Sequence, residues 1–166
     1  FVIAVPAMIS LMVAAAARGA EVPKSLKVLV SGGDRFPVEL DTRVQRLLGV
    51  GVCEGYGLTE CSPVVAVNQS FASRKIGTVG PLLPGFEHEV RDDQGNVLGK
   101  NEEGVLWLRG PSITSGYFRD PKNTAEKFKD GWFNTGDVVK IDSDGYVAIK
   151  DRASDLIIVG GFNVYP

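Results

Sequence analysis

The spacing of apolar residues changes along the chain, and each spacing predicts a different kind of element. Residues 1–17 are almost wholly apolar, and Pro6 predicts that a buried helix follows it and ends near Arg18 and Gly19. The run lacks a basic region before it and reaches only the lower edge of the ~17–25 residues that span a membrane. We therefore interpret it as a core helix and not as a signal or an anchor.

A strand, a glycine turn and an amphipathic helix are predicted next. Residues 26–30 form a β-branched run that indicates a buried strand. Pro37 suits a first helical position, and Gly49 suits the C-terminal cap. Four apolar positions between them recur at helical spacing: Leu40, Val44, Leu47 and Leu48. Residues 50–54 predict a second strand that breaks into a loop at 55–57, which completes a βαβ unit.

From about Ile76 the pattern changes to short alternating runs between Gly, Pro and Asp clusters, which predicts an antiparallel or barrel-like region. We expect hairpins built from residues 87–91, 97–98, 105–109, 138–141 and 146–149. One helix interrupts them, with Asp120 as N-cap, Pro121 behind it, and Ala125 and Phe128 on one face. Residues 142–145 resemble part of a calcium-binding loop, but Lys140 would take the first ligand position, so a turn is expected. Residues 155–166 predict a last hairpin around Gly160 and Gly161.

Composition narrows the classes of function. Glycine makes up 20 of 166 residues, well above the usual share of roughly 7%, so tight turns and close backbone approaches are expected. A net charge of −2 gives no electrostatic reason to expect a nucleic-acid partner. Cys53, Cys61 and the single His88 cannot assemble a zinc site, so both cysteines are expected to be packing residues. So few cysteines also fit a reducing cytoplasm.

The segment from Gly55 to Glu60 carries the clearest candidate chemistry. Glycines let backbone amides approach phosphate oxygens, and the Thr59 hydroxyl can donate a hydrogen bond to a phosphate. A carboxylate such as Glu60 suits Mg²⁺, and Tyr56 offers a flat face to a base. The same residues fit a glycine-shaped turn with a surface Glu and a packed Tyr equally well. Neither GxGxxG nor GxxxxGK[ST] occurs in the sequence.

Two further groups could border the same cleft. Gly32, Gly33 and Asp34 form a second glycine turn at a strand end, on the sheet edge where ligands bind. Asp137 and Arg152 flank one hairpin and could emerge together at its open end. A carboxylate can accept hydrogen bonds from two sugar hydroxyls, and a guanidinium can donate to others. A plain turn and a surface ion pair are the alternatives.

The order of these motifs resembles the adenylate-forming superfamily, which comprises acyl- and aryl-CoA ligases, luciferases and the adenylation domains of peptide synthetases. Five blocks match in order and cover nearly the whole chain: SGGDRFP (31–37), GYGLTE (55–60), GTVGPLLPG (77–85), GVLWLRGPSITSGYFRDPKNTAEKF (104–128) and DGWFNTGDVVKIDSDGYVAIKDRASDLIIVGGFNVYP (130–166). Each block alone is weak evidence, whereas their combination is specific.

The resemblance implies a two-step reaction with ATP, Mg²⁺ and coenzyme A. A carboxylate attacks the α-phosphate of ATP to give an acyl-adenylate and pyrophosphate, and a thiol then takes the acyl group. It implies that Thr59 touches the α-phosphate and that Glu60 is both catalytic and the Mg²⁺ ligand. Tyr56 would stack on adenine, and Asp137 and Arg152 would contact the ribose. The nucleotide-binding residues it implies are Gly32, Gly33, Asp34, Gly55, Tyr56, Gly57, Asp137, Ile149 and Arg152.

The resemblance also implies a division of the chain and two departures from the family pattern. Residues 1–75 resemble the end of the α/β part of the large domain, 76–150 a barrel-like β subdomain, and 151–166 the hinge and first hairpin of a small α+β domain. The hinge position, usually Asp or Lys, is Ser154 here. The family's phosphate loop and its catalytic lysine are not in this sequence, so we expect this chain alone to be inactive.

The form GYGLTECSPVV resembles fatty acyl-CoA ligases more than peptide-synthetase adenylation domains, which favours a medium- or long-chain fatty acid. The partners implied are therefore a carboxylic acid, ATP and CoA, and a long-chain substrate would add peripheral membrane contact. An aryl-CoA ligase, an acyl-carrier-protein ligase and a non-catalytic AMP-binding sensor are the alternatives.

Overall fold

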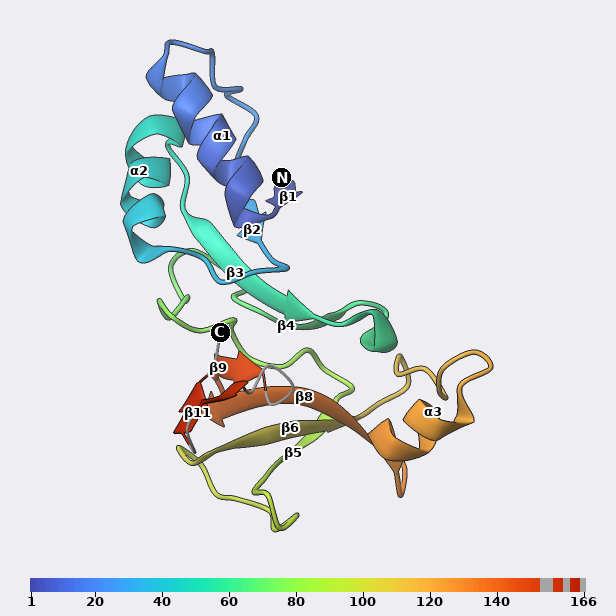
Figure 1. Ribbon diagram of the computed structural model, residues 1–166. Coiled ribbons are helices and arrows are strands. Elements are labelled where there is room, and N and C mark those ends of the chain that lie inside the picture. Colours follow the sequence, from blue (N-terminus) through green and yellow to red (C-terminus); the bar gives the residue numbers. More distant parts are fainter. Residues whose placement is uncertain (153–156, 160–161, 165–166) are drawn as a thin grey trace.

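The computed structural model describes residues 1–152, 157–159 and 162–164. Two large sheets make up most of the fold, a mixed sheet covered by two helices and a curled antiparallel sheet, as Figure 1 shows. The parallel part precedes the antiparallel part in the chain, so the predicted fold class is confirmed.

The first sheet has the order β1 (Val2–Ala4), β2 (Leu29–Ser31), β3 (Val52–Gly57) and β4 (Val64–Val67). Its first three strands are parallel, and β4 is antiparallel to β3. Helices α1 (Pro6–Ala17) and α2 (Val38–Leu48) pack on these strands through one apolar cluster. The cluster is Ala4, Ile9, Val13, Leu29, Phe36, Leu40, Val44, Leu48 and Val52.

The ends of α2 are close to the sequence prediction. Gly49 adopts the left-handed conformation with φ of 69°, and its amide donates to the Gln45 carbonyl, so the predicted C-terminal cap is confirmed. Pro37 is extended and lies one position before the helix, so its predicted place inside the first turn is wrong by one residue. The strand predicted at 26–30 begins only at Leu29, because Leu26 closes a turn by donating to the Pro23 carbonyl.

The glycines at 55 and 57 lie inside a strand, so the loop predicted at 55–57 is wrong. β3 continues through Gly57 because β4 pairs with it, with Gly55 opposite Val67 and Gly57 opposite Val64. A Cβ atom on Gly57 would lie 2.2 Å from the Pro63 carbonyl oxygen. Glycine is therefore needed here for close backbone approach between two strands and not for a turn.

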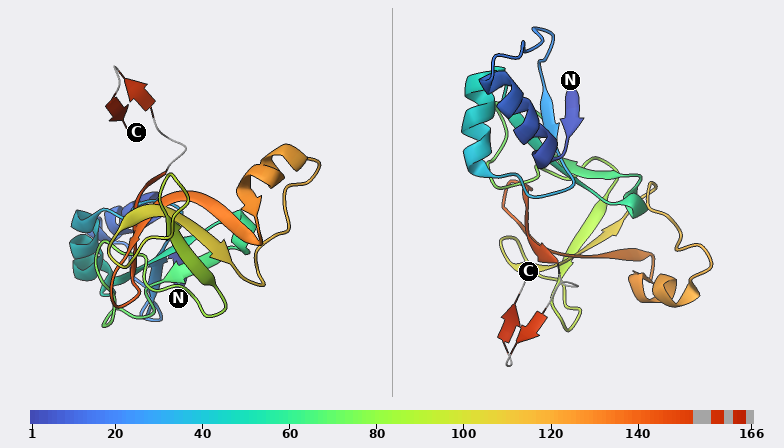
Figure 2. Two further views of the ribbon diagram at one scale, coloured as in Figure 1. Left: turned by 90° about the horizontal axis from the view of Figure 1, so that it is seen from below. Right: turned by 45° about the horizontal axis from the view of Figure 1, so that its top comes forward.

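The second sheet has the order β5 (Glu87–Arg91), β6 (Glu103–Arg109), β8 (Trp132–Ile141) and β7 (Phe128–Lys129), and β9 (Val147–Arg152) also pairs with β8. All these pairs are antiparallel, which confirms the predicted antiparallel region and the hairpin of 138–141 and 146–149, whereas the predicted strand at 97–98 is reduced to an isolated bridge between Val97 and Arg91. Helix α3 (Pro121–Lys127) begins at the predicted N-cap, where the Asp120 carboxylate accepts from the Asn123 amide. Phe128 was expected on a face of this helix but starts β7. Figure 2 shows that α3 projects at the end of the sheet, away from α1 and α2.

The second core lies between the two sheets and carries the site. It is formed mostly by the second sheet, but Cys61 and Val65 from the segment around β4 belong to the same cluster. The cluster is Cys61, Val65, Val90, Leu106, Leu108, Phe133, Val139, Ile141 and Val147. Since Cys61 is buried there, the residues just before it are fixed above the second sheet.

A buried ion pair fastens the segment after β4 to α2. The Arg74 guanidinium donates to both oxygens of Asp41, at 2.8 and 2.6 Å, and also to the Val52 carbonyl oxygen of β3. Burial alone would raise the pKa of Asp41, but the hydrogen bonds and charge of Arg74 and the amide of Gln45 hold that pKa below its ordinary value. The pair therefore holds Asp41 ionised inside the fold.

Several smaller predictions can be checked directly. Residues 142–145 form a turn, with the Gly145 amide donating to the Asp142 carbonyl, and Lys75 binds the carboxylates of Asp142 and Asp144. Cys53 and Cys61 are free and buried, as expected of packing residues.

β10 (Ile157–Val159) and β11 (Phe162–Val164) pair antiparallel, as the predicted last hairpin requires, whereas the glycines of that hairpin and Ser154 lie outside the described residues. Within the described ranges, no helix has the length and apolar character needed to cross a membrane.

Candidate active site

A short 3₁₀ turn, η1 (Thr59–Cys61), presents the two candidate catalytic side chains. The chain leaves β3 at Gly57, and the Leu58 amide then donates to the Pro63 carbonyl at 2.8 Å, which closes the loop. The Glu60 carbonyl accepts from the Thr114 amide at 2.8 Å. With Cys61 buried in the second core, Thr59 and Glu60 are held at the edge of that core.

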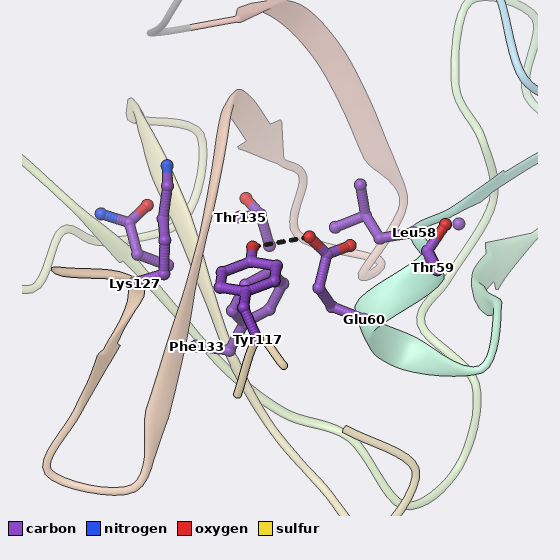
Figure 3. Close-up of a pocket in the computed structure, with 9 residues that line it drawn as sticks. Leu58, Thr59, Glu60, Tyr117, Lys127, Phe133 and Thr135 are labelled. Atoms are coloured by element: carbon purple, nitrogen blue, oxygen red, sulfur yellow. Dashed lines mark hydrogen bonds between the residues drawn. The ribbon is translucent and has the colours of Figure 1, made fainter. Parts of the chain in front are cut away.

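Thr59 and Glu60 line a hollow with a cavity volume of about 350 Å³ between the two sheets, drawn in Figure 3. Its lining residues come from four segments of the chain and are Gly57, Leu58, Thr59, Glu60, Tyr117, Lys127, Phe133, Asn134 and Thr135. The first four belong to the segment that the sequence singled out. The other five were not predicted.

Tyr117 is the functional residue that sequence reasoning missed most clearly. Its hydroxyl donates to Glu60 Oε1 at 2.6 Å, the contact marked in Figure 3. Burial, followed by the hydrogen bond to Glu60 and its charge, raises the pKa of Tyr117 to about 12, so the hydroxyl stays a donor at neutral pH. Its ring packs edge-on against Phe128, which stacks on Phe133. Only its place in the block 104–128 could have pointed to it.

Tyr56 and Asp137, both predicted to bind a nucleoside, are joined to each other. The Tyr56 hydroxyl donates to Asp137 Oδ2, and the Asp137 side chain is buried, with 3% of the residue exposed. Burial, then the charge and hydrogen bond of Asp137, raises the pKa of Tyr56 far above its ordinary value. The Asp137 amide donates to the Thr135 hydroxyl at 3.1 Å. The tyrosine ring is therefore fixed beside the hollow, with its hydroxyl protonated.

Asp137 pairs with Arg152 in the β8–β9 register, as predicted for two residues at the open end of one hairpin. The contact implied for the Arg152 guanidinium lies outside what the structure describes. Ile149 lies on the same strand, β9, and is half-buried against the second core.

The predicted second glycine turn lies beside β3. Ser31 pairs with Glu54, and a Cβ atom on Gly32 would lie 3.4 Å from the Gly55 carbonyl oxygen. Gly33 has a φ of +83°, which favours glycine, and the exposed Asp34 carboxylate accepts from the Arg35 amide. The two segments are thus neighbours, as expected, although Gly32, Gly33 and Asp34 do not line the hollow at Glu60.

The donor atoms of the hollow fit Mg²⁺ delivered with a phosphate ligand. Mg²⁺ in phosphate-transfer sites is held by one or two carboxylates, with the substrate phosphates and water completing its shell. Glu60 supplies one carboxylate, of which Oε1 accepts from Tyr117, and the Thr59 side chain adds a hydroxyl. Among the described residues no group of three or more His, Cys, Asp or Glu side chains could hold a metal ion. The hollow therefore suits a Mg²⁺ ion that is already bound to the phosphates of a nucleotide.

Comparisons with known proteins place the chain in a family. A model of the family described as AMP-binding enzyme matches residues 1–118. The long-chain-fatty-acid–CoA ligase of Yersinia pestis is 41% identical over 142 residues, which are 86% of this chain and 25% of that protein. The feruloyl-CoA synthase of an Amycolatopsis species is 39% identical over 145 residues, 86% of this chain and 29% of that protein.

The fold also matches solved structures. The O-succinylbenzoate coenzyme A synthetase from Bacillus subtilis, solved with ATP and a magnesium ion, superposes with a TM-score of 0.82 and 30% sequence identity. The match covers 99% of this chain and 34% of that one. The chain thus spans about a quarter of the length of its curated relatives and about a third of this structure.

Proposed function

This chain belongs to the AMP-binding enzyme family, and from that membership we propose that the protein containing it is an ATP-dependent acid–thiol ligase. The carboxylate of the acid substrate attacks the α-phosphate of ATP and displaces pyrophosphate, which gives an acyl-adenylate. The thiol of coenzyme A then attacks the acyl carbon and releases AMP. The observation that carries the proposal is the hollow in which Glu60, held by Tyr117, and Thr59 lie together.

In the first step Glu60 and Thr59 act on the phosphates. Bound Mg²⁺ would neutralise charge on the phosphate oxygens as the bond to pyrophosphate breaks. Glu60 would hold that ion through its carboxylate, while Tyr117 keeps the carboxylate in one orientation. The Thr59 hydroxyl would donate to an α-phosphate oxygen. Positioning and electrostatics supply most of the rate enhancement in such transfers, so fixed donors matter more than a covalent nucleophile.

The nucleoside would lie next to the hollow. Tyr56 offers its ring to adenine, and the bond to Asp137 fixes the orientation of that ring. Asp137 and Arg152 are the proposed ribose contacts, which their cross-strand pairing supports. Gly32, Gly33, Asp34, Gly55, Gly57 and Ile149 complete the proposed nucleotide-binding set.

The acid substrate is proposed to be a medium- or long-chain fatty acid. The name of the Yersinia pestis relative supports this choice, and that of the Amycolatopsis relative supports an aryl acid as the alternative. A carrier protein instead of CoA as thiol, and a sensor that binds AMP without catalysis, remain the other candidates. We also propose that the protein works in the cytoplasm, with peripheral membrane contact if its substrate is long-chain; the two free, buried cysteines fit a reducing compartment.

The test is product formation by the full-length protein. It would be incubated with ATP, Mg²⁺, CoA and a panel of fatty, aryl and amino acids, and pyrophosphate and acyl-CoA would be measured. We expect both products with fatty acids. Pyrophosphate without acyl-CoA would favour a carrier-protein acceptor, and products with aryl acids only would reject the fatty-acid proposal. Because this chain covers only part of its relatives, we expect the isolated 166 residues to form no acyl-adenylate.

A further inference from the structure

Lys127 lines the same hollow as Glu60 but was not singled out by any motif. It is the last residue of α3 and is half-buried. Figure 3 shows it on one side of the hollow, with Thr59 on the other. A Cβ atom on Gly136 would lie 3.3 Å from Lys127 Nζ, so the ammonium group lies against the segment that leads into Asp137.

Within the described part of the chain, Lys127 makes neither a hydrogen bond nor an ion pair. Some basic side chains that are at least partly buried are paired, as Arg74 is with Asp41 and Lys75 with two aspartates. The acidic group nearest in the lining, Glu60, accepts from Tyr117. The hollow thus contains a cation that forms no ion pair with the acidic side chains of the described residues.

A second potential donor lines the same hollow. Asn134 also lines the hollow, and its side-chain oxygen accepts from the Gly136 amide at 2.9 Å. With its oxygen accepting from Gly136, the group that Asn134 can offer to a ligand as a donor is its amide nitrogen. Together, Lys127 and Asn134 give the lining of the hollow donors that suit an anion.

We propose that Lys127 binds the α-phosphate of the nucleotide. This inference rests on the proposed function and extends it to a residue that the motifs do not assign. The α-phosphate is bonded to the ribose on one side and to the β-phosphate on the other. Lys127 lies near both of the matching protein groups, since its ammonium is close to Gly136, the residue before Asp137, and it shares the hollow with Glu60. An ammonium group there donates to phosphate oxygens as a compact point charge.

The alternative is that Lys127 only covers apolar surface. Its aliphatic stem could shield Phe133, which also lines the hollow, while the ammonium stays in water. These two roles differ in one measurable respect. A phosphate contact strengthens binding of AMP but not of adenosine, which lacks the phosphate, whereas a packing role affects both ligands equally.

The experiment measures calorimetric dissociation constants of ATP, AMP and adenosine for the full-length protein. The variants are Lys127→Met, Lys127→Arg and the control Lys129→Met, since Lys129 is exposed and does not line the hollow. We expect Lys127→Met to weaken AMP and ATP about tenfold, the lower end for a hydrogen bond to a charged group, and to leave adenosine unchanged. Lys127→Arg should keep most of the affinity, and Lys129→Met should match the wild type.

Two results would overturn the inference alone. One is AMP affinity that Lys127→Met leaves unchanged while the wild type binds AMP well. The other is an equal loss for AMP and adenosine, which would mean that Lys127 shapes the pocket. If the wild type binds neither ATP nor AMP, the proposed function fails, and this inference fails with it.

Discussion

Replacing Tyr117 with Phe removes a single hydroxyl, the one that holds Glu60. The Tyr117 ring would keep its edge-on contact with Phe128, so the change acts on the hydrogen bond and not on packing. Hydrogen bonds to a charged group contribute about 1.5–3 kcal/mol. Tyr117 is only half-buried, so solvent replaces part of the lost bond and the lower end of this range applies. We expect Tyr117→Phe to weaken Mg²⁺ binding by about 1.5 kcal/mol, which is roughly tenfold in affinity.

The loss should appear in the concentration of Mg²⁺ that the full-length protein needs. Residues that orient a metal ligand typically contribute 10–100-fold to metal affinity or activity, in agreement with this magnitude. The assay is the rate of acid-dependent pyrophosphate release as a function of Mg²⁺ at saturating ATP. Tyr117→Phe should raise the half-saturating Mg²⁺ concentration about tenfold, while the rate at saturating Mg²⁺ should fall less.

Tyr146→Phe is the matched control. Its hydroxyl donates to the Ser73 carbonyl at 2.6 Å, so it loses a hydrogen bond of the same length away from the hollow. We expect its Mg²⁺ dependence to equal that of the wild type. The reasoning is refuted if Tyr117→Phe leaves the Mg²⁺ dependence unchanged, or if both variants shift it equally.

Three further changes test other parts of the account. Glu60→Gln should raise the Mg²⁺ requirement and strongly lower turnover in steady-state assays; wild-type kinetics at limiting Mg²⁺ would show that Glu60 is not the metal ligand. Arg74→Met leaves the Asp41 carboxylate buried and unpaired, so urea unfolding should show a loss of about 3 kcal/mol. The pKa of Asp41 is lower in the folded protein than in the unfolded one, so Asp41 stabilises the wild type above its unfolded pKa, and this stabilisation is lost as the pH falls through its folded pKa. Acid unfolding of the wild type and of Arg74→Met, followed by circular dichroism, tests this; identical pH profiles of the two proteins would contradict it. Gly57→Ala should disrupt adenylation far more than Gly55→Ala, because a Cβ on residue 57 would meet the Pro63 oxygen at 2.2 Å, whereas a Cβ on residue 55 has contacts of 3.4 Å. Equal rates of pyrophosphate exchange into ATP in the two variants would contradict this reasoning.

The parts of the fold that local patterns determine were predictable. Helix α2 and its Gly49 cap follow from apolar spacing and one glycine, and the β5–β6 and β8–β9 pairs follow from alternation between turns. The glycines of β3 were misplaced for the opposite reason. Whether Gly55 and Gly57 form a turn or continue a strand depends on pairing with β4, which short-range sequence does not report.

The candidate site was also predictable only in part. Thr59 and Glu60 were identified because a loop after a strand places them together in the sequence. Tyr117 contacts Glu60 across 57 positions, and Tyr56 contacts Asp137 across 81. Tyr56 and Asp137 were each predicted, but their hydrogen bond was not. Contacts between distant segments arise only from the packing of the two sheets, so Tyr117 and Lys127 needed the structure.

We propose that this chain forms the nucleotide-handling part of an enzyme that makes acyl-adenylates. Exchange of labelled pyrophosphate into ATP by the full-length protein tests it most directly, because the exchange requires reversible adenylate formation and no thiol. We predict exchange that depends on both a carboxylic acid and Mg²⁺ and that is lost in Glu60→Gln. Binding of AMP without any exchange across the panel of acids would contradict the account and favour a sensor.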